Sequence, residues 1–340
     1  MKKFRVERVD PEPFKEKILH LWQDNMIGSP PGRYDWLKRG NPAGETVWLA
    51  ALAEDSREIG GMISILPREV WVRGRRVRTG ILGDFVVDKP YRVFGPTWLL
   101  PKAAVDSFRD LGFAWLYTLP NAQTRKIVER VGFRDLGQMK YLVKPVAVGH
   151  YLHTALGPVL AKAAGTVVDA ALRRVARETY AFGRYALESV SEVSEEFDRL
   201  WDRVRASQEG AVGDHSSAYL RWRYLDNPLF DFSLLTCREG GCGGLSGYLV
   251  YKITDRRLEI YDYVADDSRC FGALMKALVR LARDSGCFAI YTTVFEDHPL
   301  LPALKWYLFV DARYEMRLFH LGDEESVGRR LSFLAGDRNI

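Results

Sequence analysis

The stretch GILGDFVVDKPYRVFGPTWLLPKAAVDSFRDLG, residues 80–112, joins a buried strand to an amphipathic helix through a turn that contains glycine. The apolar run 81–87 predicts the strand, and residues 88–90 end it because they include a proline. The spacing of apolar residues predicts a helix over about 98–109. Such a turn presents backbone N–H groups and the positive end of a helix dipole, which together suit an anion.

Two residues of this turn favour a pyrophosphate as the anion. Arg92 offers a charge-assisted contact, and Gly95 lacks the side chain that would block a close approach. The same pattern also fits an ordinary loop before an amphipathic helix. The residues that follow help to distinguish a pyrophosphate site from such a loop.

Those residues form a second strand, WLYTLPN at 115–121, and a short helix, AQTRKIVERV at 122–131, closed by Gly132 and Phe133. The order strand, Arg-x-x-Gly turn, helix, strand, Asn, helix, Gly-Phe resembles the GNAT superfamily of acyl-CoA N-acyltransferases. The similar stretch covers roughly residues 45–140 and, more faintly, 185–320.

The resemblance implies acetyl-CoA, or another acyl-CoA, as co-substrate and no metal. Main-chain amides of the turn would hold the CoA pyrophosphate at the positions matching Arg92, Val93, Phe94, Gly95 and Thr97. The pantetheine arm would lie along the end of the preceding strand, at Phe85, Val86 and Val87, and Asn121 matches a position that contacts cofactor or substrate. The family turn usually ends in Gly or Ala where this chain has Thr97, and Pro96 lacks an N–H. We therefore expect a turn that still holds the pyrophosphate but offers fewer backbone donors.

Asp84 is the candidate general base, because an amine must lose a proton to attack a thioester and the family often carries an acid on this strand. The alternative is that Asp84 accepts hydrogen bonds at a strand irregularity beside Gly83. The Tyr that serves the family as general acid is replaced by Val128, so Tyr117, or water, is the candidate proton donor.

An internal repeat organises the whole chain. The segments YDWLKRGNP (34–42) and YLRWRYLDNP (219–228) place Trp, Asn and Pro at the same spacing, and similar strands follow each, including one with a lone acid, Asp84 or Asp262. Antiparallel strands followed by a strand–helix–strand crossover predict an α/β fold with a mixed sheet, in two tandem GNAT-like domains. The predicted boundaries are an N-terminal domain with the acyl-CoA site at 1–145, a helical connector at 146–184 and a C-terminal domain at 185–325.

The second copy is expected to have lost its cofactor site. Its turn, ADDSRCFGALMKAL at 265–278, keeps Arg269 and Gly272, but Asp266 and Asp267 would repel a pyrophosphate. We therefore expect this copy to shape the cleft for the acceptor or an interface.

Composition sets the remaining expectations. The chain of 340 residues is 47% hydrophobic and 27% charged, as in soluble globular proteins, and its net charge of +5 is too weak to indicate nucleic acid as a partner. The four cysteines lack metal-ligand spacing, and the N-terminal residues lack the apolar core of a signal peptide, which favours reduced thiols and a cytoplasmic location. Residues 151–177 fit a packed connector helix better than a helix on a membrane surface.

These observations favour an enzyme that transfers an acyl group, acetyl above all, from acyl-CoA to a small-molecule amine such as an amino sugar of polysaccharide biosynthesis. Two alternatives stay open. One is a FemAB-like aminoacyltransferase that uses aminoacyl-tRNA, because such enzymes also contain paired GNAT-like units. The other is an acyl-CoA-binding protein without turnover.

Overall fold

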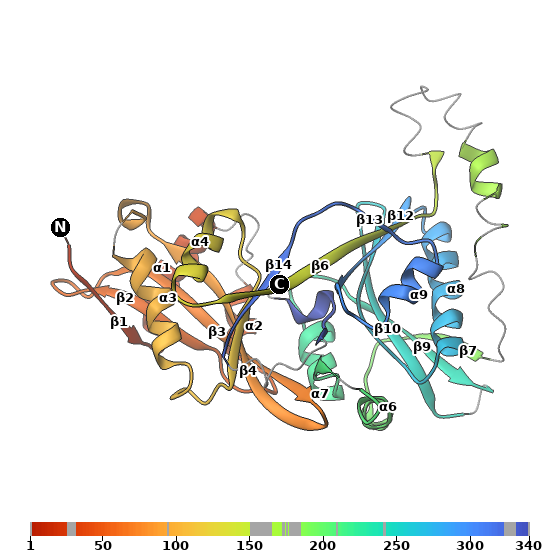
Figure 1. Cartoon of the computed structure of the whole chain (residues 1–340), viewed down its shortest axis with the longest axis horizontal. Coiled ribbons are helices and arrows are strands. Elements are labelled where there is room, and N and C mark those ends of the chain that lie inside the picture. Colours follow the sequence, from red (N-terminus) through yellow and green to blue (C-terminus); the bar gives the residue numbers. More distant parts are fainter. Residues whose placement is uncertain are drawn as a thin grey trace.

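The computed structural model describes residues 2–25, 32–93, 95–149, 165–171, 174, 176, 185–208, 210–240, 243–322 and 331–338. Across these residues fifteen strands form one mixed sheet, in the order β1-β2-β3-β4-β5-β14-β6-β12-β11-β10-β9-β7, with β8, β13 and β15 attached beside it (Figure 1). The predicted mixed α/β fold with two related halves is confirmed.

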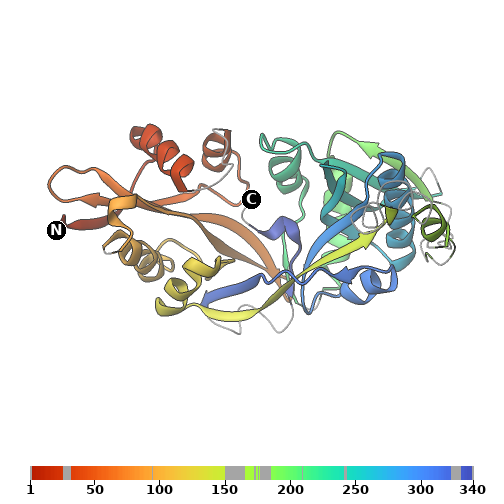
Figure 2. The same ribbon diagram turned by 90° about the horizontal axis from the view of Figure 1, so that it is seen from above.

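The first half of the sheet contains β1 (Phe4–Arg8), β2 (Val47–Ala53), β3 (Ile59–Val72), β4 (Arg75–Val87) and β5 (Trp115–Thr118). Its helices are η1 (Glu12–Phe14), α1 (Lys15–Asn25), α2 (Gly32–Lys38), η2 (Lys89–Tyr91), α3 (Pro96–Ser107) and α4 (Ala122–Arg130). Figure 2 shows α1 and α2 on one face and α3 and α4 on the other. Because both faces are covered, β2 reads VWLAALA and is buried throughout.

The second half repeats this arrangement with β7 (Tyr185–Val190), β9 (Ser233–Glu239), β10 (Leu245–Thr254), β11 (Arg257–Ala265) and β12 (Ala289–Phe295). Its helices are α6 (Glu195–Arg205), α7 (Ser217–Leu220), a π-helical turn η4 (Arg221–Leu225), α8 (Ser268–Asp284) and α9 (Leu301–Trp306). Short elements complete it: β8 (Ala211–Gly213), β13 (Val310–Asp311), β15 (Leu331–Ser332) and η5 (Ala335–Asp337).

Equivalent positions of the repeat adopt the same local conformation. The hairpin between β3 and β4 turns at Arg73 and Gly74, which both have positive φ, and the hairpin between β10 and β11 turns at Asp255 and Arg256 in the same way. This pair of positive φ angles matches the twist of a two-residue hairpin. Residues 73–76, at the tip of the first hairpin, are exposed.

The two repeated tryptophans contact each other where the halves meet. The rings of Trp36 and Trp222 stack with centroids 4.8 Å apart and planes 10° apart. Trp36 Nε1 donates to the backbone oxygen of Trp222 at 2.9 Å, and Trp222 Nε1 donates to the backbone oxygen of Arg39 at 3.2 Å. The repeat seen in the sequence therefore forms a nearly symmetric joint.

The halves also exchange strands, which the sequence did not indicate. β6 (Arg134–Pro145) leaves the first half and pairs with β12, whereas β14 (Arg317–Gly322) returns from the second half and lies between β5 and β6. The domain boundary expected near residue 145 falls at the end of β6, a strand that both halves share, and it stays a prediction. Apolar periodicity marks a strand but does not select its partner, which long-range packing decides.

The predicted connector, 146–184, and the segment considered for membrane contact, 151–177, lie mostly outside the described residues. Within the described residues no helix is long and apolar enough to cross a membrane. Cys237, Cys270 and Cys287 are buried free thiols, as expected, and Cys242 lies outside the described part of the chain.

Candidate functional site

The first half opens where β4 and β5 diverge. Gly80 pairs with Leu116 and Ile81 with Tyr117, after which β5 ends at Thr118 while β4 continues to Val87. β4 stays paired with β3 on its other side, through Val86 and Val87. Among the described residues, the edge of β4 over 83–87 that faces away from β3 therefore has no partner strand. Such an edge can pair with an extended ligand.

This open edge leads to the N-terminus of α3. Gly95 precedes the helix with φ of 77°, a conformation that favours glycine, and no side chain of the described residues caps the helix. The backbone N–H groups of Gly95 and Thr97 have no acceptor among the described residues, and the Thr97 hydroxyl donates to the Arg92 backbone oxygen at 2.7 Å. The turn thus presents donors and the positive helix end at one place.

Arg92 is held beside this turn. Its Nη2 donates to Asn25 Oδ1 of α1 at 2.6 Å, and its Nε donates to the Val87 backbone oxygen at 3.4 Å. Val93 is 79% exposed, and Phe94 lies outside the described residues. The structure thus places Arg92, Val93, Gly95 and Thr97 in one turn at the end of β4, and their contact with a cofactor stays a prediction.

The other predicted cofactor contacts lie along β4 and at α4. Val86 and Val87 are buried and Phe85 is half-buried. Asn121 precedes α4, and its Oδ1 accepts from the N–H groups of Gln123 and Thr124 at 3.0 Å each. The side-chain oxygen of Asn121 therefore caps the helix, so any contact of this side chain with a cofactor would use Nδ2.

Asp84 is buried in an ion pair. Arg33 Nη2 of α2 lies 2.8 Å from Asp84 Oδ1, and the side chains of Arg33 and Asp84 are 5% and 0% exposed. Ser64 Oγ donates to Asp84 Oδ2 at 2.6 Å. Asp84 has φ of 49°, opposite the register shift between Met62 and Ser64. These contacts favour the alternative in which Asp84 holds a strand irregularity, and its role as base stays a prediction.

Tyr117 is also fully buried. Its hydroxyl donates to the backbone oxygen of Asp337 at 3.0 Å, and burial, together with the Asp337 charge, raises the pKa of Tyr117 well above its usual value. A phenol held in this way favours a structural role over proton donation, which stays a prediction. The sequence could not show this, because Asp337 lies 220 positions further along the chain.

The corresponding turn of the second half is blocked by its own side chain. Asp267 Oδ1 accepts from the N–H groups of Arg269 and Cys270, at 2.9 and 2.8 Å, and so caps α8. Asp266 pairs with Arg203 at 3.0 Å. A carboxylate thus takes the amides that a pyrophosphate would need, which supports the expectation that this copy holds no CoA.

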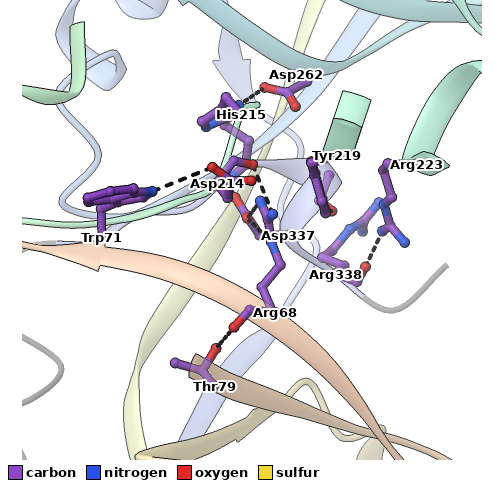
Figure 3. Close-up of polar contacts among 12 residues, drawn as sticks. Arg68, Trp71, Thr79, Asp214, His215, Tyr219, Arg223, Asp262, Asp337 and Arg338 are labelled. Carbon is purple, nitrogen blue, oxygen red and sulfur yellow. Dashed lines mark hydrogen bonds and ion pairs between the residues drawn. The ribbon is translucent and has the colours of Figure 1, made fainter. Parts of the chain in front are cut away.

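A buried polar cluster joins the two halves and was not foreseen (Figure 3). Arg68 of β3 pairs with Asp337 Oδ1 at 2.8 Å and donates through Nη1 to the Asp214 backbone oxygen at 2.9 Å. The Arg68 guanidinium lies 3.5 Å from the centroid of the Tyr219 ring. Only the apolar run after residue 330 could have signalled that the end of the described chain is buried here.

Beside this cluster lies a cleft of about 260 Å³ between β3 and α6. Its lining mixes acidic, basic and indole side chains, namely Glu69, Asp198, Asp202 and Asp214, Arg68, Arg76 and Arg205, and Trp71 and Trp201. Trp71 and Trp201 both donate from Nε1 to Asp214 Oδ1, at 3.4 and 3.2 Å. Within the described residues no group of His, Cys, Asp and Glu is arranged to hold a metal ion.

The fold is similar to those of solved N-acyltransferases. A GCN5-related N-acetyltransferase from Anabaena variabilis matches with a TM-score of 0.67 and 15% identity, over 94% of this chain and 72% of that one. The corresponding protein from Kribbella flavida gives 0.65 and 16%, over 94% and 71%. Saccharomyces cerevisiae N-myristoyltransferase with bound myristoyl-CoA gives 0.60 and 14%, over 94% and 79%.

No protein-family model and no curated protein sequence matches the chain. The solved structures nevertheless extend over both halves of the sheet, so the chain has the fold of the GCN5-related N-acyltransferases. The resemblance drawn from the strand, turn and helix at 80–112 is confirmed at the level of the fold.

Proposed function

We propose that the protein transfers an acyl group, acetyl above all, from acyl-CoA to an amine. The observation that carries this proposal is the open edge of β4, which leads directly to the uncapped N-terminus of α3. The pyrophosphate would lie against the N–H groups of Gly95 and Thr97, with Arg92 adding charge. The pantetheine arm would pair along residues 85–87, which brings the thioester to the point where β4 and β5 diverge.

The reaction at that point needs an amine without its extra proton. The amine nitrogen attacks the thioester carbonyl, a proton leaves the nitrogen, and the CoA thiolate departs with a proton from an acid or from water. Holding both reactants in the opening can provide much of the rate acceleration, so the reaction does not require proton transfer by Asp84 or Tyr117. Their roles as base and acid remain the narrower part of the proposal.

The acceptor is proposed to be a small molecule with a cationic amine, an amino sugar being the narrower candidate. The cleft between β3 and α6 does not by itself select a cation, because Arg76 pairs with Glu69 and Arg205 pairs with Asp202 within its lining. An enzyme that uses aminoacyl-tRNA would not need the turn at 92–97, so a test of acetyl-CoA binding separates the two enzyme classes.

The test is a pair of glycine substitutions with matched backbones. Gly95 and Gly240 both have positive φ, 77° and 67°, and neither would bring a new Cβ within 3.4 Å of another atom. Acetyl-CoA at 100 times its dissociation constant should stabilise the wild type by about 2.7 kcal/mol. Gly95→Glu should abolish this shift by adding bulk and negative charge at the pyrophosphate, whereas Gly240→Glu should retain it.

If folded Gly95→Glu and Gly240→Glu bind acetyl-CoA equally well, the assignment of the pyrophosphate site to the turn at 92–97 is wrong. Release of free CoA thiol with a panel of amines then measures transfer. Tight binding of acetyl-CoA without transfer to any amine would instead support a binding protein without turnover.

A further inference from the structure

A cavity in the second half lies where β11 and β12 diverge. These strands pair from Arg257 with Ala289 to Ile260 with Thr292, and β11 then continues without β12 to Ala265. A half-open cavity of about 70 Å³ lies beside this end of β11, lined also by α6 and by the segment around β15. In the repeat, the end of β11 corresponds to the end of β4. The cavity thus occupies the place where the second half would hold a reacting group.

Three buried polar side chains line this cavity: His215, His298 and Ser332, which are 3%, 5% and 6% exposed. His215 Nδ1 lies 2.9 Å from Asp262 Oδ1, and His298 Nδ1 accepts the Leu300 N–H at 3.0 Å. Figure 3 shows Asp262 beside the His215 ring. Among the described residues, no hydrogen bond engages either Nε2 atom or the Ser332 hydroxyl, and none of these atoms is among the fully buried unpaired ones, so each is open to the pocket.

The contacts at Nδ1 determine whether the Nε2 atom of each ring carries a hydrogen that can be donated into the cavity. Because His298 Nδ1 accepts a hydrogen bond, its Nε2 carries the hydrogen, and burial lowers the pKa of His298 to about 3, which keeps the ring neutral. Burial also opposes a charge on His215, but the Asp262 carboxylate outweighs it and raises the pKa of His215. Protonated His215 then presents a second N–H.

The other groups around His215 do not change this conclusion. The Tyr248 hydroxyl lies 3.4 Å from Nδ1, and the Trp201 ring packs edge-on against the imidazole. Asp337 adds to the rise in the pKa of His215, and Arg68 opposes it. No Asp or Glu is among the residues that line the cavity, so no carboxylate of its lining opposes an anion.

We propose that this cavity is a binding site for a small monocarboxylate, whose oxygens accept hydrogen bonds from His215, His298 and Ser332. One water needs about 10–15 Å³ of such volume, so the cavity has room for an acid of a few heavy atoms, from acetate to butyrate. Val212, Val264 and Leu334 provide apolar walls for the hydrocarbon end. The site is independent of the acyl-CoA turn.

Ligand-observed NMR or calorimetric titration with sodium acetate, propionate and butyrate at pH 6 tests the proposal. Acetamide has the same shape without the charge, and phosphate is a different anion. Acetate should bind saturably and at least about tenfold more tightly than acetamide, because hydrogen bonds to a charged acceptor are the stronger ones. Its affinity should fall as the pH rises and His215 loses its proton.

Three variants test the lining of the cavity. Ser332→Ala removes only a hydroxyl, His298→Gln removes the ring N–H donor, and Val264→Phe fills the cavity. Each should weaken acetate binding by about tenfold or more, whereas His20→Gln, on the exposed side of α1, should not. Three results would each overturn the proposal: no saturable carboxylate binding by the folded wild type, equal binding of acetamide or phosphate, or equal binding by all variants. Acetyl-CoA titration of the same samples reports separately on the first half.

Discussion

Replacing Asp84 with asparagine tests whether its buried carboxylate holds a strand in place or moves a proton. The ion pair with Arg33 is 2.8 Å long and its side chains are 5% and 0% exposed. Removing one charge of a buried pair typically costs about 3–5 kcal/mol, because the other charge is left in a low-dielectric interior. Asparagine can still accept from Ser64, so we expect a loss near the lower end, about 3 kcal/mol.

Urea unfolding followed by circular dichroism measures this loss in Asp84→Asn. The matched control is Asp106→Asn, which breaks the Lys102–Asp106 pair of α3, 2.9 Å long but with side chains 53% and 57% exposed. An exposed pair of this kind should cost no more than about 0.5 kcal/mol. Replacing both charges, Arg33→Met with Asp84→Asn, should recover much of the stability, as a double-mutant cycle would show.

Kinetics at a temperature where every variant is folded completes the experiment. If Asp84 is structural, the double variant should keep the shape of the wild-type pH–rate profile. An Asp84→Asn protein that is as stable as the wild type but has lost turnover would refute the structural reasoning and restore Asp84 as the base.

Four further outcomes are expected. His298 has a folded pKa of about 3, below its ordinary 6.5, so the free energy of unfolding should fall as the pH drops from about 6.5 toward 3. In urea titrations, the loss between pH 7 and pH 5 should be about 2 kcal/mol smaller in His298→Gln than in the wild type. Trp36→Ala and Trp222→Ala should each cost about 3–5 kcal/mol, and their double cycle should show a coupling of about 1 kcal/mol. Asp267→Ala should destabilise the protein by about 1 kcal/mol through loss of the α8 cap, measured by thermal unfolding, without creating a second acetyl-CoA site in calorimetry. A stop after Tyr314 removes β14 from between β5 and β6, and proteolysis should then find the first half unfolded as well; a protected, acetyl-CoA-binding first half would contradict the strand exchange.

The sequence predicted the elements that depend on local patterns. The strand–turn–helix at 80–112 follows from apolar spacing, proline and glycine, and the Trp repeat follows from two matching segments. The contacts that decide the chemistry were less visible. Asp84 could be read as base or as structural until Arg33 was seen beside it, because the partner lies 51 positions away and has no motif. Arg68 and Asp337 are 269 positions apart, beyond any local signal.

The strand exchange makes the packing of the first half depend on the second half. β14 supplies the partner that β5 lacks, and β5 borders the opening in which the thioester is proposed to lie. The segment 331–338 adds Phe333, which stacks on Trp115, and Asp337, which pairs with Arg68. A first half deprived of these contacts would have an unpaired strand edge and an uncompensated buried arginine. The second half therefore supplies β14 and the segment 331–338 to the wall beside this proposed opening.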